Sequence, residues 1–175
     1  MNDEIQFLTS GDSRVTELQL KQALQIAEDV FQTATGSSHI EIGDENVQWT
    51  TKNLPECWIL ILSGNDCIGS VAVLPSTSEK MNSFFSGKID ESELMHFAKT
   101  KITSVQTFDC LYLSGVTIRS DFQKRGIGTS ALIHAIAAAQ VALPNAKTLF
   151  TWTYTDAGGK LIRKIQENYE IRIRS

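Results

Sequence analysis

The stretch Gln123-Lys124-Arg125-Gly126-Ile127-Gly128-Thr129 joins an apolar segment, residues 111–118, to an apolar, alanine-rich segment, residues 129–142. We expect the first segment to be a strand and the second a helix. The two glycines let the main chain approach a ligand without interference from a Cβ atom. The helix start directs unpaired N–H groups and its positive dipole end to the same place, and Lys124 and Arg125 add positive charge at the rim. The stretch therefore predicts a loop that binds a diphosphate.

Two other kinds of glycine loop compete with this interpretation. Residues 126–131 fit a relaxed G-x-G-x-x-A dinucleotide motif, but that motif expects its glycines directly after the strand and an acidic residue at the end of the next strand. Here residues 119–125 intervene, and the next strand, residues 148–155, has no carboxylate before Asp156. A P-loop is excluded because Gly159-Lys160 is followed by Leu161 and lacks the earlier glycine.

The loop resembles the acyl-CoA-binding signature of the GNAT superfamily of N-acyltransferases, a Gln/Arg-x-x-Gly-x-Gly/Ala pattern between a strand and a helix. Gln123, Gly126 and Gly128 fill this pattern, while Ser120 stands where the family usually has a proline. The resemblance implies acetyl-CoA as cosubstrate, with the pantetheine arm bonded by strand backbone in a gap beside the next parallel strand. The implied cofactor-binding residues are Val116, Ile118, Gln123, Lys124, Arg125, Gly126, Ile127, Gly128 and Thr129.

The order of the expected elements extends this resemblance over most of the chain. Strands are expected at residues 5–8, 58–62, 68–74, 111–118, 148–155 and 169–174, and helices at 13–33, 91–99, 129–142 and 156–168. Residues 63–66 form a hairpin turn, and residues 36–55 are expected to be irregular. The order resembles the GNAT fold, an α/β fold with a central mixed sheet flanked by helices. Residues 1–175 are then a single domain with a long insert before the signature strand and a short C-terminus.

The insert, residues 76–108, contains one expected helix that begins with a Ser or Asp cap. A long connection beside a ligand site is a candidate for substrate selection. A surface elaboration without function is the alternative.

Acylation of an amine needs a neutral amine, a donor for the developing oxyanion and a proton for the departing thiolate. The resemblance places a glutamate base at positions that here hold Ser114 and Tyr112. We take these two as the candidate catalytic residues, relaying a proton through water; the alternative is that Tyr112 is a core aromatic. The family's general-acid tyrosine is replaced by Ile162, and Tyr154 and Tyr169 either substitute for it or are structural.

The composition restricts the partners. A net charge of −4 argues against a nucleic-acid backbone, and an amine-bearing small molecule or peptide fits better. The longest apolar run near the middle, residues 58–62, is far too short for a membrane span, and the first residues lack the layout of a signal peptide, so we expect a cytoplasmic protein.

The cysteines and histidines show no pattern of a disulfide or a metal site. Cys57, Cys67 and Cys110 are odd in number and widely spaced, which favours buried thiols. The histidines at 39, 96 and 134 have no ligand spacing and are expected at the surface or the edge of the core.

Two functions remain open. The first is an N-acetyltransferase that moves an acetyl group from acetyl-CoA to a primary amine of a small molecule or peptide. The second is a non-catalytic acyl-CoA-binding module that senses or scaffolds, favoured by the missing glutamate and tyrosine. The last strand alternates, with Tyr169, Ile171 and Ile173 on one face, so its outer edge is expected either to pair in a homodimer or to be guarded by charge in a monomer.

Overall fold

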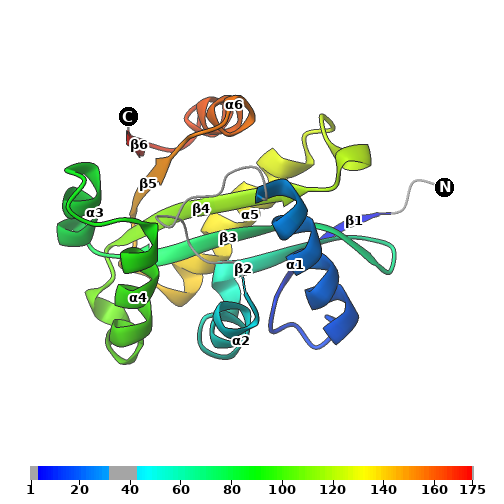
Figure 1. Ribbon diagram of the computed structural model, residues 1–175, viewed down its shortest axis with the longest axis horizontal. Coiled ribbons are helices and arrows are strands. Elements are labelled where there is room, and N and C mark those ends of the chain that lie inside the picture. The colour runs from blue at the N-terminus through cyan, green and yellow to red at the C-terminus, as the bar shows by residue number, and fades with distance from the viewer. Residues whose placement is uncertain (1–3, 32–42, 175) are drawn as a thin grey trace.

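The computed structural model describes residues 4–31 and 43–174, which form a six-stranded sheet covered by helices on both faces (Figure 1). The strand order is β1-β2-β3-β4-β5-β6. Pairing is antiparallel from β1 to β4 and parallel from β4 to β6, so the sheet is mixed as the sequence predicts. The strands are β1 Ile5–Thr9, β2 Trp58–Ser63, β3 Asp66–Ser76, β4 Cys110–Ile118, β5 Thr148–Trp152 and β6 Ile171–Arg174.

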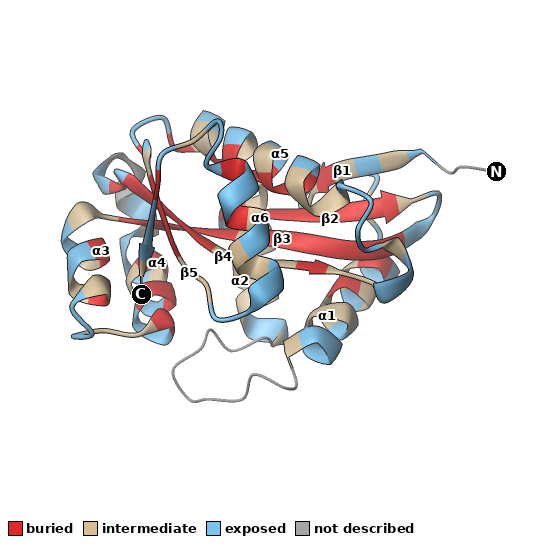
Figure 2. Ribbon diagram, turned by 90° about the horizontal axis from the view of Figure 1, so that it is seen from above, coloured by how far each residue is buried: buried red, intermediate tan, exposed pale blue. Residues whose placement is uncertain are grey.

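The helices divide between the two faces of the sheet (Figure 2). On one face lie α5 (Ile127–Ala142) and α6 (Asp156–Ile165); on the other lie α1 (Glu17–Phe31), α3 (Ser78–Phe85) and α4 (Glu91–Lys101). Helix α2 (Asp44–Asn53) lies beside α4. An ion pair joins the two helices, with 3.1 Å between Glu45 Oε1 of α2 and Lys99 Nζ of α4. Short 3₁₀ turns occupy Pro55–Cys57, Ile102–Thr107 and Ser120–Phe122.

Strand β4 connects the two layers of the core because its side chains alternate between the faces. Leu111 and Leu113 belong to the cluster beneath α5, whereas Cys110 and Tyr112 belong to the cluster beneath α3 and α4. This burial on both faces explains why the sequence of this strand is almost wholly apolar.

The sequence correctly predicts the fold and the principal elements, with differences at their ends. Helix α5 begins at Ile127 and not at residue 129, and the predicted hairpin turn is present with Gly64 at φ 60°. Two helices were missed. The first lies in residues 36–55, for which the sequence predicts irregular structure: residues 44–53 form α2, which has no buried residue and hence no apolar period to detect. Residues 36–42 lie outside the described ranges, as do residues 32 and 33 of the first predicted helix.

The apolar residues Leu18, Leu20, Leu24, Ala27, Val30 and Phe31 recur at roughly helical spacing and predict an amphipathic helix, but two of them do not face the core. Leu18 is 66% exposed and Val30 is also exposed, while Gln19 and Ala23 are the buried positions. The Gln19 amide donates to the Asn65 carbonyl at 2.9 Å, which ties α1 to the hairpin and explains why a polar residue is buried there.

The insert is part of the core and not a surface elaboration. Its two helices bury Met81, Phe84, Leu94, Met95 and Ala98 against β3, β4 and β5. Helix α3, which the sequence did not predict, is capped by Thr77; α4 has the predicted cap in a capping box of Asp90 and Glu93.

The alternation expected in β6 is only partly present. Ile171 is buried, but Ile173 is 41% exposed. Arg172 is exposed with its guanidinium over the ring of Phe85, and the half-buried Arg174 has its guanidinium over Phe84 and Trp152, at 4.4–5.1 Å from the ring centroids. Since β6 lies at the edge of the sheet, homodimer pairing through it stays a prediction.

The three cysteines are buried thiols, as the sequence predicts. His96 and His134 are exposed, and His39 lies outside the described residues. In the described part of the chain no helix is long and apolar enough to cross a membrane, and no three His, Cys, Asp or Glu side chains gather as metal ligands.

The close approach of β3 and β4 gives a test of the fold. A Cβ at Gly69 would lie 2.1 Å from the Thr117 carbonyl oxygen, so Gly69→Ala should lower the free energy of unfolding by about 3 kcal/mol or more. Gly159→Ala in α6 is the matched control: the added Cβ meets only the Arg163 guanidinium at 3.9 Å, and we expect a gain of about 0.5–1 kcal/mol from helix propensity. Urea unfolding measures both, and equal stability of the two variants would contradict the predicted contact.

Candidate active site

The main feature of the site is a fork between β4 and β5. The two strands pair only over Cys110–Tyr112 and Thr148–Phe150, after which the hydroxyl of Thr151 donates to the Leu113 carbonyl at 2.9 Å. From Ser114 to Ile118, no strand of the described residues pairs with β4 on its β5 side, although β3 pairs with it along the other side. A row of backbone N–H and C=O groups is thus available to a ligand.

The glycine loop lies at the far end of this open strand. Gly126 has φ 79°, a conformation that a side chain disfavours, and Lys124 also has a positive φ of 62°. Within the described residues no side chain caps the N-terminus of α5. Its first N–H groups therefore remain as donors for an anion.

Gly128 allows α5 to pack closely on β4. A Cβ at this position would lie 3.2 Å from Ile118 Cδ1 and 3.5 Å from Val116 Cγ1. The Gln123 side chain donates to the Ile118 carbonyl at 2.9 Å, which ties the loop to the end of the strand. The structure therefore brings together the predicted cofactor residues of β4 and of the loop.

The positive charge around the loop is partly fixed in place. Arg125 donates to the Asp121 carbonyl at 2.8 Å, and both Arg119 and Arg125 lie over the ring of Phe122, at 4.8 and 5.1 Å. Arg119 also pairs with the Asp121 carboxylate, which lowers the pKa of that carboxyl. Lys124 is exposed at the turn itself.

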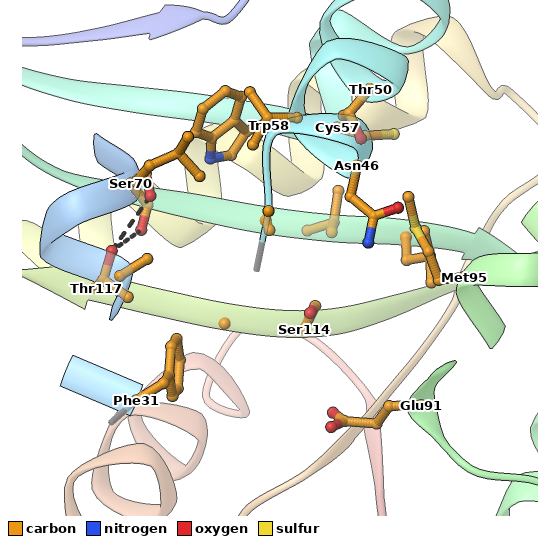
Figure 3. A pocket seen from close by; sticks show the side chains of 18 of the residues that line it. Phe31, Asn46, Thr50, Cys57, Trp58, Ser70, Glu91, Met95, Ser114 and Thr117 are labelled. Atoms are coloured by element: carbon orange, nitrogen blue, oxygen red, sulfur yellow. Dashed lines mark hydrogen bonds between the residues drawn. The ribbon is translucent and has the colours of Figure 1, made fainter. Parts of the chain in front are cut away.

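A cavity of about 160 Å³ lies on the opposite face of β4, among α1, α2 and α4 (Figure 3). A β-bulge makes Ser114 an extra residue on β4, since Leu113 faces Val73 and Gly115 faces Ala72. Bulges of this kind redirect side chains beside active sites. Ser114 and Gly115 both line the cavity, together with Tyr154, which follows the end of β5. The cavity therefore reaches the fork.

Most of the cavity wall is apolar, with contributions from Leu24, Ala27, Phe31, Val73 and Met95. At one end, the Ser70 and Thr117 hydroxyls bond each other at 3.2 Å. At the other end, Glu91 extends its side chain from α4 toward the cavity (Figure 3).

Glu91 is only 2% exposed, and its carboxylate accepts a short hydrogen bond from the Tyr112 hydroxyl. Burial, and then the nearby Glu91 charge, raises the pKa of Tyr112 far above its ordinary value, so this hydroxyl stays protonated and acts as a donor. Burial, followed by Glu91, also raises the pKa of Tyr154, to about 12.

These positions separate the two candidate catalytic residues. Ser114 lines the cavity, whereas Tyr112 lies in the core beneath it, packed against Phe84 and Phe150 at centroid distances of 5.3 and 5.0 Å. Ile162 is buried in the core beneath α5, and Tyr169 packs against the same cluster. Of the two tyrosines considered as substitutes for the general acid, only Tyr154 lines the cavity.

Sequence reasoning missed Glu91 as a site residue. Its neighbours Asp90 and Glu93 form the capping box, and the acidic run is accounted for as a helix start. The one feature of the sequence that points to Glu91 is its place in the long insert, residues 76–108, which is a candidate for substrate selection.

The fold of this chain is similar to that of several solved acetyltransferases. The diaminobutyrate acetyltransferase of Paenibacillus lautus, in complex with its substrate L-2,4-diaminobutyric acid and coenzyme A, superposes with a TM-score of 0.58 at 11% identity, covering 94% of this chain and 76% of that one. The Drosophila melanogaster polyamine N-acetyltransferase superposes with a TM-score of 0.57 at 12% identity, and the mosquito arylalkylamine N-acetyltransferase-like 5b with a TM-score of 0.56 at 9% identity. Each match covers 93% of this chain and 82% of the other chain. Likeness at this level of identity concerns the fold.

The sequence itself also matches a family. No curated protein matches it, but the model of the Acetyltransferase (GNAT) family matches residues 21–160. The fork beside β4, the loop before α5 and this match agree, and the chain belongs to the GNAT acetyltransferase family.

Proposed function

We propose that this chain is an N-acetyltransferase that transfers the acetyl group of acetyl-CoA to a primary amine of a small molecule or peptide. The observation that carries this proposal is the meeting of two sites on one strand. Residues 114–118 of β4 have open backbone groups at the fork, the glycine loop at one end, and the cavity on the other face.

The residues of the fork and the loop fit acetyl-CoA. The diphosphate would lie at the uncapped start of α5, where Gly126, Ile127 and Gly128 offer backbone N–H groups. Lys124 and Arg125 would add positive charge, and the backbone of Val116 and Ile118 would bond the pantetheine arm. Bound there, acetyl-CoA supplies an acetyl group as a thioester, and the cavity supplies the place for the amine.

One observation favours a second function, a non-catalytic acyl-CoA-binding module. Ile162 fills the position of the family's general-acid tyrosine and is buried in the core, so its position offers no proton to a departing thiolate. A non-catalytic acyl-CoA-binding module would have the same loop and fork. The proposed enzyme needs another proton source, and the Tyr154 hydroxyl at the cavity wall is the candidate.

A thiol-release assay separates the two functions. The protein is incubated with acetyl-CoA and with panels of primary amines, peptides and aminoglycosides, while free thiol is followed by colour reaction. We expect release that depends on an acceptor amine, with the acetylated product seen by mass spectrometry. Tight binding of coenzyme A without release on any panel would establish the module instead.

The loop gives a second prediction. Gly126→Asp places a carboxylate beside the proposed diphosphate position and at the positive end of the α5 dipole, so it should raise the Kd for coenzyme A about tenfold or more, equivalent to about 1.4 kcal/mol. Isothermal titration calorimetry measures this change.

Gly87→Asp is the matched control, because Gly87 has a similar φ of 73° but lies between α3 and α4. Both variants carry the cost of a side chain at positive φ, so both should lose some stability. Only the loop variant should lose affinity, and equal affinity of the two for coenzyme A would refute the assigned binding site.

A further inference from the structure

The described wall of the cavity contains one ionisable carboxyl group. Among the described residues that line it, Glu91 is the one carboxylic acid, and none is a lysine, an arginine or a histidine. The other groups that titrate there are held neutral: burial raises the pKa of the Cys57 thiol to about 12, and burial with Glu91 raises that of Tyr154 to about 12. The Ser70 and Thr117 hydroxyls are bonded to each other.

The size of the cavity also restricts the ligand. Its volume is about 160 Å³, compared with about 300–1,000 Å³ for sites of drug-sized ligands. A dry apolar cavity of about 150 Å³ accommodates a benzene molecule. The apolar wall therefore fits a body of about six carbon atoms.

We infer that the cavity binds a small monocationic primary amine with an apolar body, and that Glu91, carried by the insert, receives the ammonium proton before acetyl transfer. This inference rests on the proposed function and assigns its acceptor class and its base. A second ammonium on the ligand, or a carboxylate, would be buried against described wall residues that offer it no counter-charge, which is unfavourable.

Glu91 is suited to this role by its surroundings. The Tyr112 hydroxyl on β4 donates to the carboxylate and fixes it, and Tyr154 lies on the β5 side. The Arg174 charge on β6 lowers the pKa of Tyr112, whereas the Glu91 charge raises it. At the start of α4, which carries Glu91, Asp90 and Glu93 are bonded in the capping box. Among the described residues of the cavity wall, Glu91 is therefore the proton acceptor.

The proton and electron balance of the reaction is complete with these groups. One ammonium proton moves to a Glu91 carboxylate oxygen and leaves a neutral amine. The nitrogen lone pair forms the C–N bond to the acetyl carbonyl carbon, the C–S bond breaks, and its electron pair goes to sulfur. A second proton passes from nitrogen to the thiolate, the third stays on the amide, and Glu91 releases its proton to solvent.

The acceptor class is tested with a six-carbon series: hexylamine, hexane-1,6-diamine, 6-aminohexanoate and hexan-1-ol. Calorimetry in the presence of coenzyme A should show binding of hexylamine at least tenfold tighter than of the other three. Glu91→Gln, which keeps an oxygen to accept from Tyr112, should abolish this preference. Glu45→Gln is the control, since the Glu45 side chain is 93% exposed. Equal binding across the series, or an unchanged preference in Glu91→Gln, would overturn the assignment.

The proton-acceptor role has its own readout. At neutral pH, Glu91→Gln should lower kcat/KM for hexylamine about a hundredfold or more. The defect should shrink as the pH approaches the pKa of the amine, and it should be much smaller for 2,2-difluorohexylamine, whose ammonium is more acidic. A defect of equal size at every pH and for both amines would mean a structural role and overturn the inference.

These measurements also separate this inference from the proposed function. Hexylamine binding that depends on Glu91, without thiol release, would sustain the ligand class assigned to the cavity and refute both the transferase and the role of Glu91 as its base. Thiol release with other amines and no binding of hexylamine would sustain the transferase and refute the acceptor class.

Discussion

The separation of β4 from β5 is the constraint on which the rest of the site depends. Unsatisfied backbone groups inside a protein cost about 1–3 kcal/mol each, so two parallel strands normally stay paired. Here the pairing stops after Tyr112 and Phe150, and the Thr151 hydroxyl satisfies the Leu113 carbonyl at the branch point. Because β3 pairs with β4 along its other side, the strand stays in the sheet while one row of its backbone groups remains open to a ligand.

The bulge at Ser114 adds a second consequence to this separation. Before the bulge, Tyr112 faces the insert helices and is sealed in the core; after it, Gly115 and Thr117 line the cavity, while Val116 and Ile118 face α5. The same five residues of β4 therefore serve both faces. Their side chains on one face contact the start of α5, and those on the other face line the cavity. The proposed cofactor site and the cavity are therefore formed by the same stretch of strand.

The part of the site that follows from local sequence could be predicted, and the part that depends on distant contacts could not. The glycine loop is local: Gly126 needs its positive φ, Gly128 needs close packing, and both precede a helix. Glu91 meets Tyr112 only because α4 folds back over β4, and these residues are 21 positions apart. Nothing in their spacing indicates that contact. Helix α2 was missed for a related reason, since it buries no residue and shows no apolar period.

The origin of Glu91 in the insert has a physical basis. A carboxylate in the first turn of a helix is favoured by the helix dipole, and the same turn is fixed by the Asp90 capping box. One turn further along, Leu94 and Met95 are buried in the core, which fixes the direction of the side chain. Placing the charge on a separate helix leaves the open backbone of β4 undisturbed, so one strand can serve the cofactor side while α4 supplies the carboxylate of the acceptor side.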